Sequence, residues 1–129
     1  MDAHDLQKVP LYAGLSHKER EKIARWSDTV DLPAGKHLLE QGRLPHEFFV
    51  VLEGEVEVTH DGERLAMMGP GDFFGEIALI QHGRRTASVV TTAPSRLAVM
   101  SPASFVAMRR EMPEVTERID TAIRERLQR

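Results

Sequence analysis

The feature that most constrains the fold of this 129-residue chain is the regular recurrence of glycine and proline between residues 29 and 100. Turn-forming residues separate short runs rich in Val, Leu, Phe and Thr throughout this part. They are Pro33, Gly35, Gly42, Pro45, Gly54, Gly62, Gly69, Pro70, Gly71, Gly75, Gly83 and Pro94. Short strands separated by turns at roughly 8–12-residue spacing are typical of a β-sandwich or barrel. The sequence therefore predicts a mainly β domain here.

Two runs indicate how their strands are buried. Val56, Val58 and His60 alternate with more polar residues, which is the period-two pattern of a strand with one buried face. Asp61-Gly62 follows directly and predicts a hairpin turn. The run 48–52 is continuously apolar and predicts a strand buried on both faces.

Helices are expected on both sides of this β region. Ser16 and Glu19 have the spacing of a capping box, which predicts a helix over residues 17–27. Pro102 follows a serine and opens a second helix, and Pro113 opens a third. The apolar residues of the third helix share one stripe: Val115, Ile119, Ala122, Ile123 and Leu127. That stripe must be buried on the barrel, on a ligand or on a partner.

Length and composition limit the class of protein. The length fits one domain, with a helical segment at 1–28, a β-roll at 29–101 and closing helices at 102–129. The absence of cysteine excludes disulfides, thiolate metal sites and cysteine nucleophiles. The net charge of −3 argues against direct nucleic-acid binding. No apolar run is long enough to span a membrane and the start is unlike a signal peptide, so we expect a cytoplasmic location.

The chemistry is concentrated after the glycine-rich turn at residues 69–75. Gly75 permits a close backbone approach, and a helical turn over 76–80 would present N–H groups that attract an anion. Arg85 lies nine residues after Glu76, so a short loop can return it to the same pocket, where its planar donors match phosphate oxygens. A carboxylate repels phosphate, but Glu76 can accept from a sugar hydroxyl. Phosphate together with ribose indicates a nucleotide.

The segments Phe-Gly-Glu-Ile-Ala-Leu at 74–79 and Arg-Thr-Ala-Ser-Val at 85–89 resemble the paired motifs of the cyclic-nucleotide-binding domain family. Residues 11–16 and 48–58 resemble that family's N-terminal entry and its central hairpin, so the resemblance covers nearly the whole chain. It is strongest to the channel-type domains. It implies a jelly-roll-like antiparallel β-roll with N-terminal helices, a short helix in a phosphate cradle at 74–88, and C-terminal helices.

The resemblance also implies roles for individual residues. Glu76 would accept from the ribose 2′-hydroxyl, and Arg85 would pair with the cyclic phosphate. Arg126, thirteen residues after Pro113, matches an arginine that contacts the base in channel-type domains. The remaining positions line the cradle or contact the base: Gly75, Ile77, Ala78, Thr86 and Ala87 for the cradle, Val58 and Met68 for the base. Outside such a motif, Glu76 and Arg85 could simply pair with each other, and Arg126 could simply favour the helix end.

We therefore expect a regulatory module that binds cAMP more readily than cGMP, uses no cofactor or metal and catalyses nothing. Ligand binding would close the C-terminal helix and signal to an effector (a channel, kinase or regulator). The chain has no His-x-His pair, nucleophile elbow or Walker A loop, which argues against an enzyme. The alternative is a degenerate domain that binds no nucleotide and serves as a protein-interaction surface. Such relatives usually lose the glutamate or the arginine, and both are present here.

Overall fold

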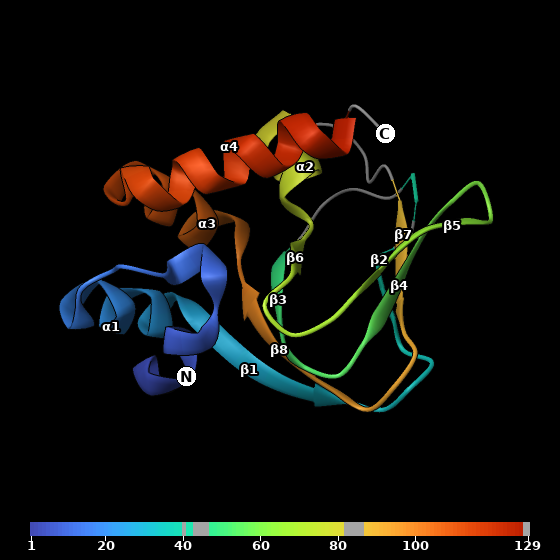
Figure 1. The fold of residues 1–129 in the computed structure, drawn as a ribbon, viewed down its shortest axis with the longest axis horizontal. Helices are drawn as coiled ribbons and strands as arrows, with labels where there is room; N and C mark the ends of the chain where they lie inside the picture. Colours follow the sequence, from blue (N-terminus) through green and yellow to red (C-terminus); the bar gives the residue numbers. More distant parts are fainter. Residues whose placement is uncertain (40, 43–46, 82–86, 128–129) are drawn as a thin grey trace.

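The computed structural model describes residues 1–39, 41–42, 47–81 and 87–127, with the backbone alone at 78, 79, 81 and 127. Within these ranges the chain forms a β-roll with helices packed on one side and across one end (Figure 1). The N-terminal helices lie beside β1, and the last helix runs across the top of the molecule. Among the described residues, no helix has both the length and the apolar character needed to cross a membrane.

Among the residues that the structure describes, the β-roll consists of two four-stranded sheets in which all pairs of strands are antiparallel. The first sheet has the order β1 (Ser27–Leu32), β8 (Ser95–Met100), β3 (Phe48–Glu53) and β6 (Phe73–Phe74). The second has the order β2 (His37–Leu39), β7 (Ser88–Thr91), β4 (Val56–His60) and β5 (Glu63–Met68). The mainly β fold expected from the spacing of turn residues is confirmed.

The β4–β5 hairpin forms where Asp61-Gly62 predicts it. Both residues have positive φ angles, 52° at Asp61 and 81° at Gly62, which suit the tight turns that match strand twist. The register places Val56 opposite Met68 and Glu57 opposite Met67. Met67 is 38 % exposed, whereas Met68 packs into the interior between the sheets.

The strand β3 is buried on both faces, as its continuous apolar run predicts. Phe48 and Val50 belong to a core between the first sheet and the helices. Phe49 and Val51 belong to a second core between the two sheets. Successive side chains of a strand point to opposite faces, so one strand divides the interior into two compartments.

Over the described ranges, the helical layer has six segments. They are the 3₁₀ helices η1 (Ala3–Lys8) and η2 (Pro10–Tyr12), and the α-helices α1 (His17–Trp26), α2 (Glu76–Gln81), α3 (Pro102–Glu111) and α4 (Pro113–Leu127). The capping box of Ser16 and Glu19 is present at the start of α1, with bonds of 3.1 and 3.0 Å. The stripe of α4 is buried within the chain itself: Val115 and Ile119 are fully buried and Ile123 is 7 % exposed.

Candidate functional site

The site is organised around the start of α2. The strand β6 pairs with β3 through Phe49 and Phe74, whose rings stack at 4.9 Å, and this holds the end of β6 against the first sheet. Gly75 follows with a φ of 94°, a conformation that favours glycine. The chain then enters α2 at Glu76, which is only 1 % exposed. The helix predicted to start at Glu76 is thus present over Glu76–Gln81, and it begins with a buried carboxylate.

The buried carboxylate of Glu76 is paired with Arg126 from the last turns of α4. The Nη1 of Arg126 donates to Oε1 of Glu76, and its Nη2 donates to the backbone carbonyl of Phe73. The guanidinium also lies over the Phe73 ring, 4.8 Å from the ring centroid, which is cation–π geometry. The side chain of Arg126 is 19 % exposed. Because these contacts converge on one guanidinium, the end of α4 is fastened directly above the start of α2.

The apolar side chains expected at the base lie on the inner face of the second sheet. Val58 on β4 is 8 % exposed, and Met68 on β5 packs into the same cluster of apolar residues. Ala66, which pairs with Val58, and Val89 on β7 belong to the same cluster. Over its described residues this wall is therefore apolar, and it offers contact area but no side-chain hydrogen bonds to a ring placed against it.

The remaining expected site residues divide into two groups. Gly75, Ile77 and Ala78 lie at or near the start of α2, and Ala87 packs against the core between the sheets. Ile77 packs against the core beneath the helices. Arg85 and Thr86, expected at the phosphate, lie outside the described residues. The described part therefore unites Glu76 with Arg126 and leaves the expected phosphate contacts as predictions.

The sequence missed Phe73 as a member of the site. Its ring and its carbonyl oxygen both hold Arg126. No residue type in the sequence marks a backbone carbonyl as an acceptor, and an aromatic residue two positions before Gly75 is typical of ordinary core. The resemblance assigned Arg126 to the base; in this structure its guanidinium contacts Glu76 and Phe73.

A β-roll carrying a short helix with a buried carboxylate, covered by a C-terminal helix, is the architecture of a class of ligand-binding domain. Residues 29–111 match the family described as the cyclic nucleotide-binding domain. The chain belongs to this family, and the resemblance drawn from its motifs is confirmed.

Two proteins of known function are similar to this chain in sequence. The cAMP-dependent protein kinase regulatory subunit of Schizosaccharomyces pombe is 34 % identical over 101 residues, 78 % of this chain and 24 % of the relative. The cyclic AMP receptor protein of Thermus thermophilus is 32 % identical over 123 residues, 92 % of this chain and 57 % of the relative. The chain thus spans between a quarter and somewhat over half of these relatives. Neither is a channel, so the expected likeness to channel-type domains stays an expectation.

A solved structure gives the same picture. The regulatory domain of Toxoplasma gondii protein kinase A in complex with cAMP superposes with a TM-score of 0.84 and 27 % sequence identity. The match covers 95 % of this chain and 48 % of that one. Over the part that superposes, the fold of this chain is therefore that of a cyclic nucleotide-binding domain.

Proposed function

We propose that this domain senses cAMP and reports its presence by closing α4 over the nucleotide. The observation that carries the proposal is the ion pair between Glu76 and Arg126. It joins the carboxylate expected to read the ribose to the helix expected to cover the base. A change at one is therefore felt at the other.

The proposed ribose contact is compatible with the ion pair. A carboxylate has two oxygens and about four acceptor positions. Glu76 can therefore hold the Arg126 guanidinium and still accept from a ribose 2′-hydroxyl. In this arrangement Arg126 fixes the direction of the carboxylate as well as the end of α4, so the sugar contact and the closed helix support each other.

The other roles follow the positions of the residues. Arg85 and Thr86 would hold the cyclic phosphate through charge-assisted and hydroxyl or backbone hydrogen bonds. Gly75, Ile77, Ala78 and Ala87 would line the cradle. Val58 and Met68 would contact the purine from the inner face of the second sheet, and Arg126 would lie at the edge of the base while it holds Glu76.

The apolar wall favours adenine over guanine. Guanine carries more polar groups on its edge, and each one buried without a partner costs free energy. The kinase regulatory subunit and the receptor protein to which this chain is similar carry cAMP in their names. The hydroxyl of Thr86 could still bond to guanine, so we propose that cGMP also binds, but more weakly than cAMP.

The output of the domain would be a change in its contact with an effector such as a kinase, channel or regulator. We propose no catalytic step, because the described part of the site offers binding groups and no nucleophile placed next to a base. A second candidate function is a degenerate domain that acts only as an interaction surface. The buried ion pair between Glu76 and Arg126 is the observation in its favour, because such a pair can also be purely structural.

Calorimetric titration of the purified chain with cAMP and with cGMP tests the proposal. We expect a dissociation constant for cAMP of about 1 μM or lower, equivalent to about −8 kcal/mol. Absence of both heat and thermal shift at millimolar nucleotide would leave only the degenerate domain. A preference for cGMP of tenfold or more would overturn the choice of cAMP.

Two matched variants test the roles of the residues. Arg85→Ala should weaken binding by one to two orders of magnitude, from the loss of about 1.5–3 kcal/mol per charge-assisted bond, whereas Arg84→Ala should change it little. Equal effects would show that the wrong arginine was assigned. Glu76→Gln should reduce the preference for cAMP over its 2′-deoxy analogue, and an unchanged preference would remove Glu76 from the ribose.

A further inference from the structure

The side chain of Gln41, two residues after the end of β2, forms two hydrogen bonds with the turn of the β4–β5 hairpin. Its Nε2 donates to Oδ1 of Asp61 at 2.8 Å, and its Oε1 accepts from the amide of Asp61 at 2.9 Å. The other carboxylate oxygen of Asp61 lies 3.2 Å from Nε2 of His60. An amide side chain that donates to a residue and also accepts from it restricts that residue in two directions. Gln41 therefore holds the end of the hairpin.

The backbone of Gln41 is bonded to a different part of the second sheet. Its amide donates to Oγ of Ser88 at 3.0 Å, and Ser88 is the first residue of β7. Ser88 comes two residues after Thr86 and three after Arg85, the residues proposed to hold the phosphate. Gln41 therefore ties the start of β7 to the hairpin that carries the apolar wall proposed for the base.

The outer part of the β4–β5 hairpin has an irregular ladder. Val58 lies opposite Ala66, and the next residue of β4, Thr59, lies opposite Arg64. Leu65 is therefore an extra residue on β5, and such a bulge interrupts the ladder and bends the strand. Leu65 is 51 % exposed, and β5 is the edge strand of its sheet. The ladder thus holds the turn beyond the bulge less firmly, so contacts from outside the hairpin contribute more to its position.

We propose that Gln41 is a positioning residue that sets the separation between the phosphate end of the site and the apolar wall for the base. Its side chain holds the hairpin turn, and its amide holds the start of β7. A nucleotide that spans both parts then meets a fixed separation, which lowers the cost of ordering the site on binding. This inference rests on the proposed function, because it assumes that these two parts hold a phosphate and a base.

The first test breaks the contact between Gln41 and Asp61 and then rebuilds it with the opposite polarity. Gln41→Glu places a carboxylate against that of Asp61, and Asp61→Asn then supplies an amide that donates to the new carboxylate. Asp61 has a φ of 52°, a conformation that Asn also adopts, so the turn is retained. We expect Gln41→Glu to weaken cAMP binding by about fivefold, the effect of one or two exposed hydrogen bonds. The double variant should recover at least half of that loss on a logarithmic scale, and absence of this rescue would overturn the inference.

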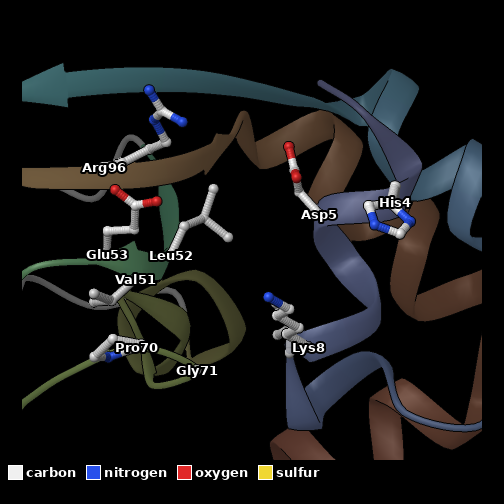
Figure 2. A pocket seen from close by; sticks show the side chains of 10 residues that line it. His4, Asp5, Lys8, Val51, Leu52, Glu53, Pro70, Gly71 and Arg96 are labelled. Atoms are coloured by element: carbon white, nitrogen blue, oxygen red, sulfur yellow. The ribbon is translucent and has the colours of Figure 1, made fainter.

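A matched pair of alanine variants separates positioning from a general loss of stability. Gln41→Ala should narrow the preference for cAMP over cGMP by about threefold, because a less fixed wall excludes the more polar guanine less well. The preference for cAMP over its 2′-deoxy analogue, assigned to Glu76, should stay the same. The control is Gln7→Ala on η1, beside a cleft of about 300 Å³ lined by Asp5 and Lys8 (Figure 2). Figure 1 shows this N-terminal part on the opposite side of the molecule from the β4–β5 turn, so Gln7→Ala should change neither preference. Equal results for Gln41→Ala and Gln7→Ala would contradict a positioning role.

The second test needs no nucleotide. Gln41 is exposed, so we expect its variants to keep the fold. In the unliganded protein Gln41→Glu should raise hydrogen exchange both in residues 59–64 and in residues 88–91, and the addition of Asp61→Asn should reverse both changes. Gln7→Ala should leave both segments as they are. If exchange in 88–91 does not respond to Gln41→Glu, Gln41 does not connect the two parts. This measurement decides the inference even if calorimetry shows that the wild-type chain does not bind cAMP.

Discussion

The guanidinium of Arg126 pairs with the buried carboxylate of Glu76, fifty residues earlier in the chain, and fastens the end of α4 to the start of α2. The two residues are separated by the whole of β7, β8 and α3. The pair is therefore a tertiary contact between two helices that would form opposite sides of the nucleotide site.

The ion pair predicts an asymmetry between its two residues. Arg126→Ala deprives a buried carboxylate of a charged partner and should lower the free energy of unfolding by about 1–3 kcal/mol. We use this lower range rather than that of a fully buried pair because Arg126 is 19 % exposed, so water can reach the end of α4. Glu76→Gln should cost less, since it removes the buried charge itself. Urea unfolding measures both.

The double variant provides the control for this asymmetry. Glu76→Gln added to Arg126→Ala should recover stability, because no buried carboxylate then remains. If the two losses simply add, the residues do not interact energetically, since independent sites give additive changes.

The proposed covering role of α4 predicts a local change on binding. Hydrogen exchange in the last turns of α4, from Thr121 to Leu127, should slow on addition of cAMP. It should slow less in the first half, where Thr116 donates to the carbonyl of Arg109 and Arg118 donates to the carbonyl of Leu11. Ligand binding would select the closed arrangement from those already populated. Removal of the residues after Ala122 should weaken binding, because it deletes Ile123 and Arg126. Unchanged exchange together with normal binding by the truncated chain would show that α4 is a docking surface and not a lid.

Gly54 connects β3 to β4 and should not tolerate a side chain. It has a φ of 97°, and an added Cβ would lie 2.2 Å from Oγ of Ser95 and 2.6 Å from the carbonyl oxygen of Pro94. Gly54→Ala should therefore destabilise the fold by at least about 3 kcal/mol, beyond the 1–3 kcal/mol typical of backbone strain alone. Gly35→Ala has the same kind of backbone strain without the clash, so its free energy of unfolding, measured by thermal unfolding, should fall markedly less. Equal losses of stability in the two variants would mean that Pro94 and Ser95 move to accommodate the methyl group.

Tyr12 predicts a loss of stability at alkaline pH. Burial raises the pKa of its phenol well above the usual value of 10.0. The folded state therefore keeps the proton that the unfolded chain loses, so the stabilisation is complete below about pH 10 and declines above it by up to about 1.4 kcal/mol per pH unit. As Tyr12 is the only tyrosine of the chain, tyrosinate absorbance reports it directly.

The control for the alkaline transition is Tyr12→Phe, which lacks the titrating group and should unfold at higher pH. Ionisation of Tyr12 near pH 10 without unfolding would contradict the burial argument.

The parts of the fold that local rules determine were predictable from the sequence. The capping box of Ser16 and Glu19, the turn at Asp61-Gly62 and the double burial of 48–52 each depend on neighbouring residues only. The cradle was recognised by its motif, and the structure confirms the helical turn that starts at Glu76. The phosphate contacts of Arg85 and Thr86 stay predictions.

The contacts that depend on how the helices pack against the rest of the fold were not predictable from the sequence. The position of Arg126 along α4 follows from counting residues after Pro113, but its partner depends on where α4 crosses α2. Gly71 lies so close to Pro10 that an added Cβ would come within 2.9 Å of its Cδ, and nothing in the sequence near either residue indicates the other. The shift in register near the end of β3, between Val51 and Glu53, likewise has no local signature.

The alternation of β3 between two compartments has a consequence for how such a domain can vary. Phe49 and Val51 face the compartment that contains Val58 and Met68, whereas Phe48 and Val50 face the one that contains the buried stripe of α4. Substitutions of Phe49 or Val51 therefore change the shape of the proposed base wall. Substitutions of Phe48 or Val50 change the surface on which the helices pack. Ligand preference and strength of response can consequently drift independently in a lineage, although the residues that control them are adjacent in the chain.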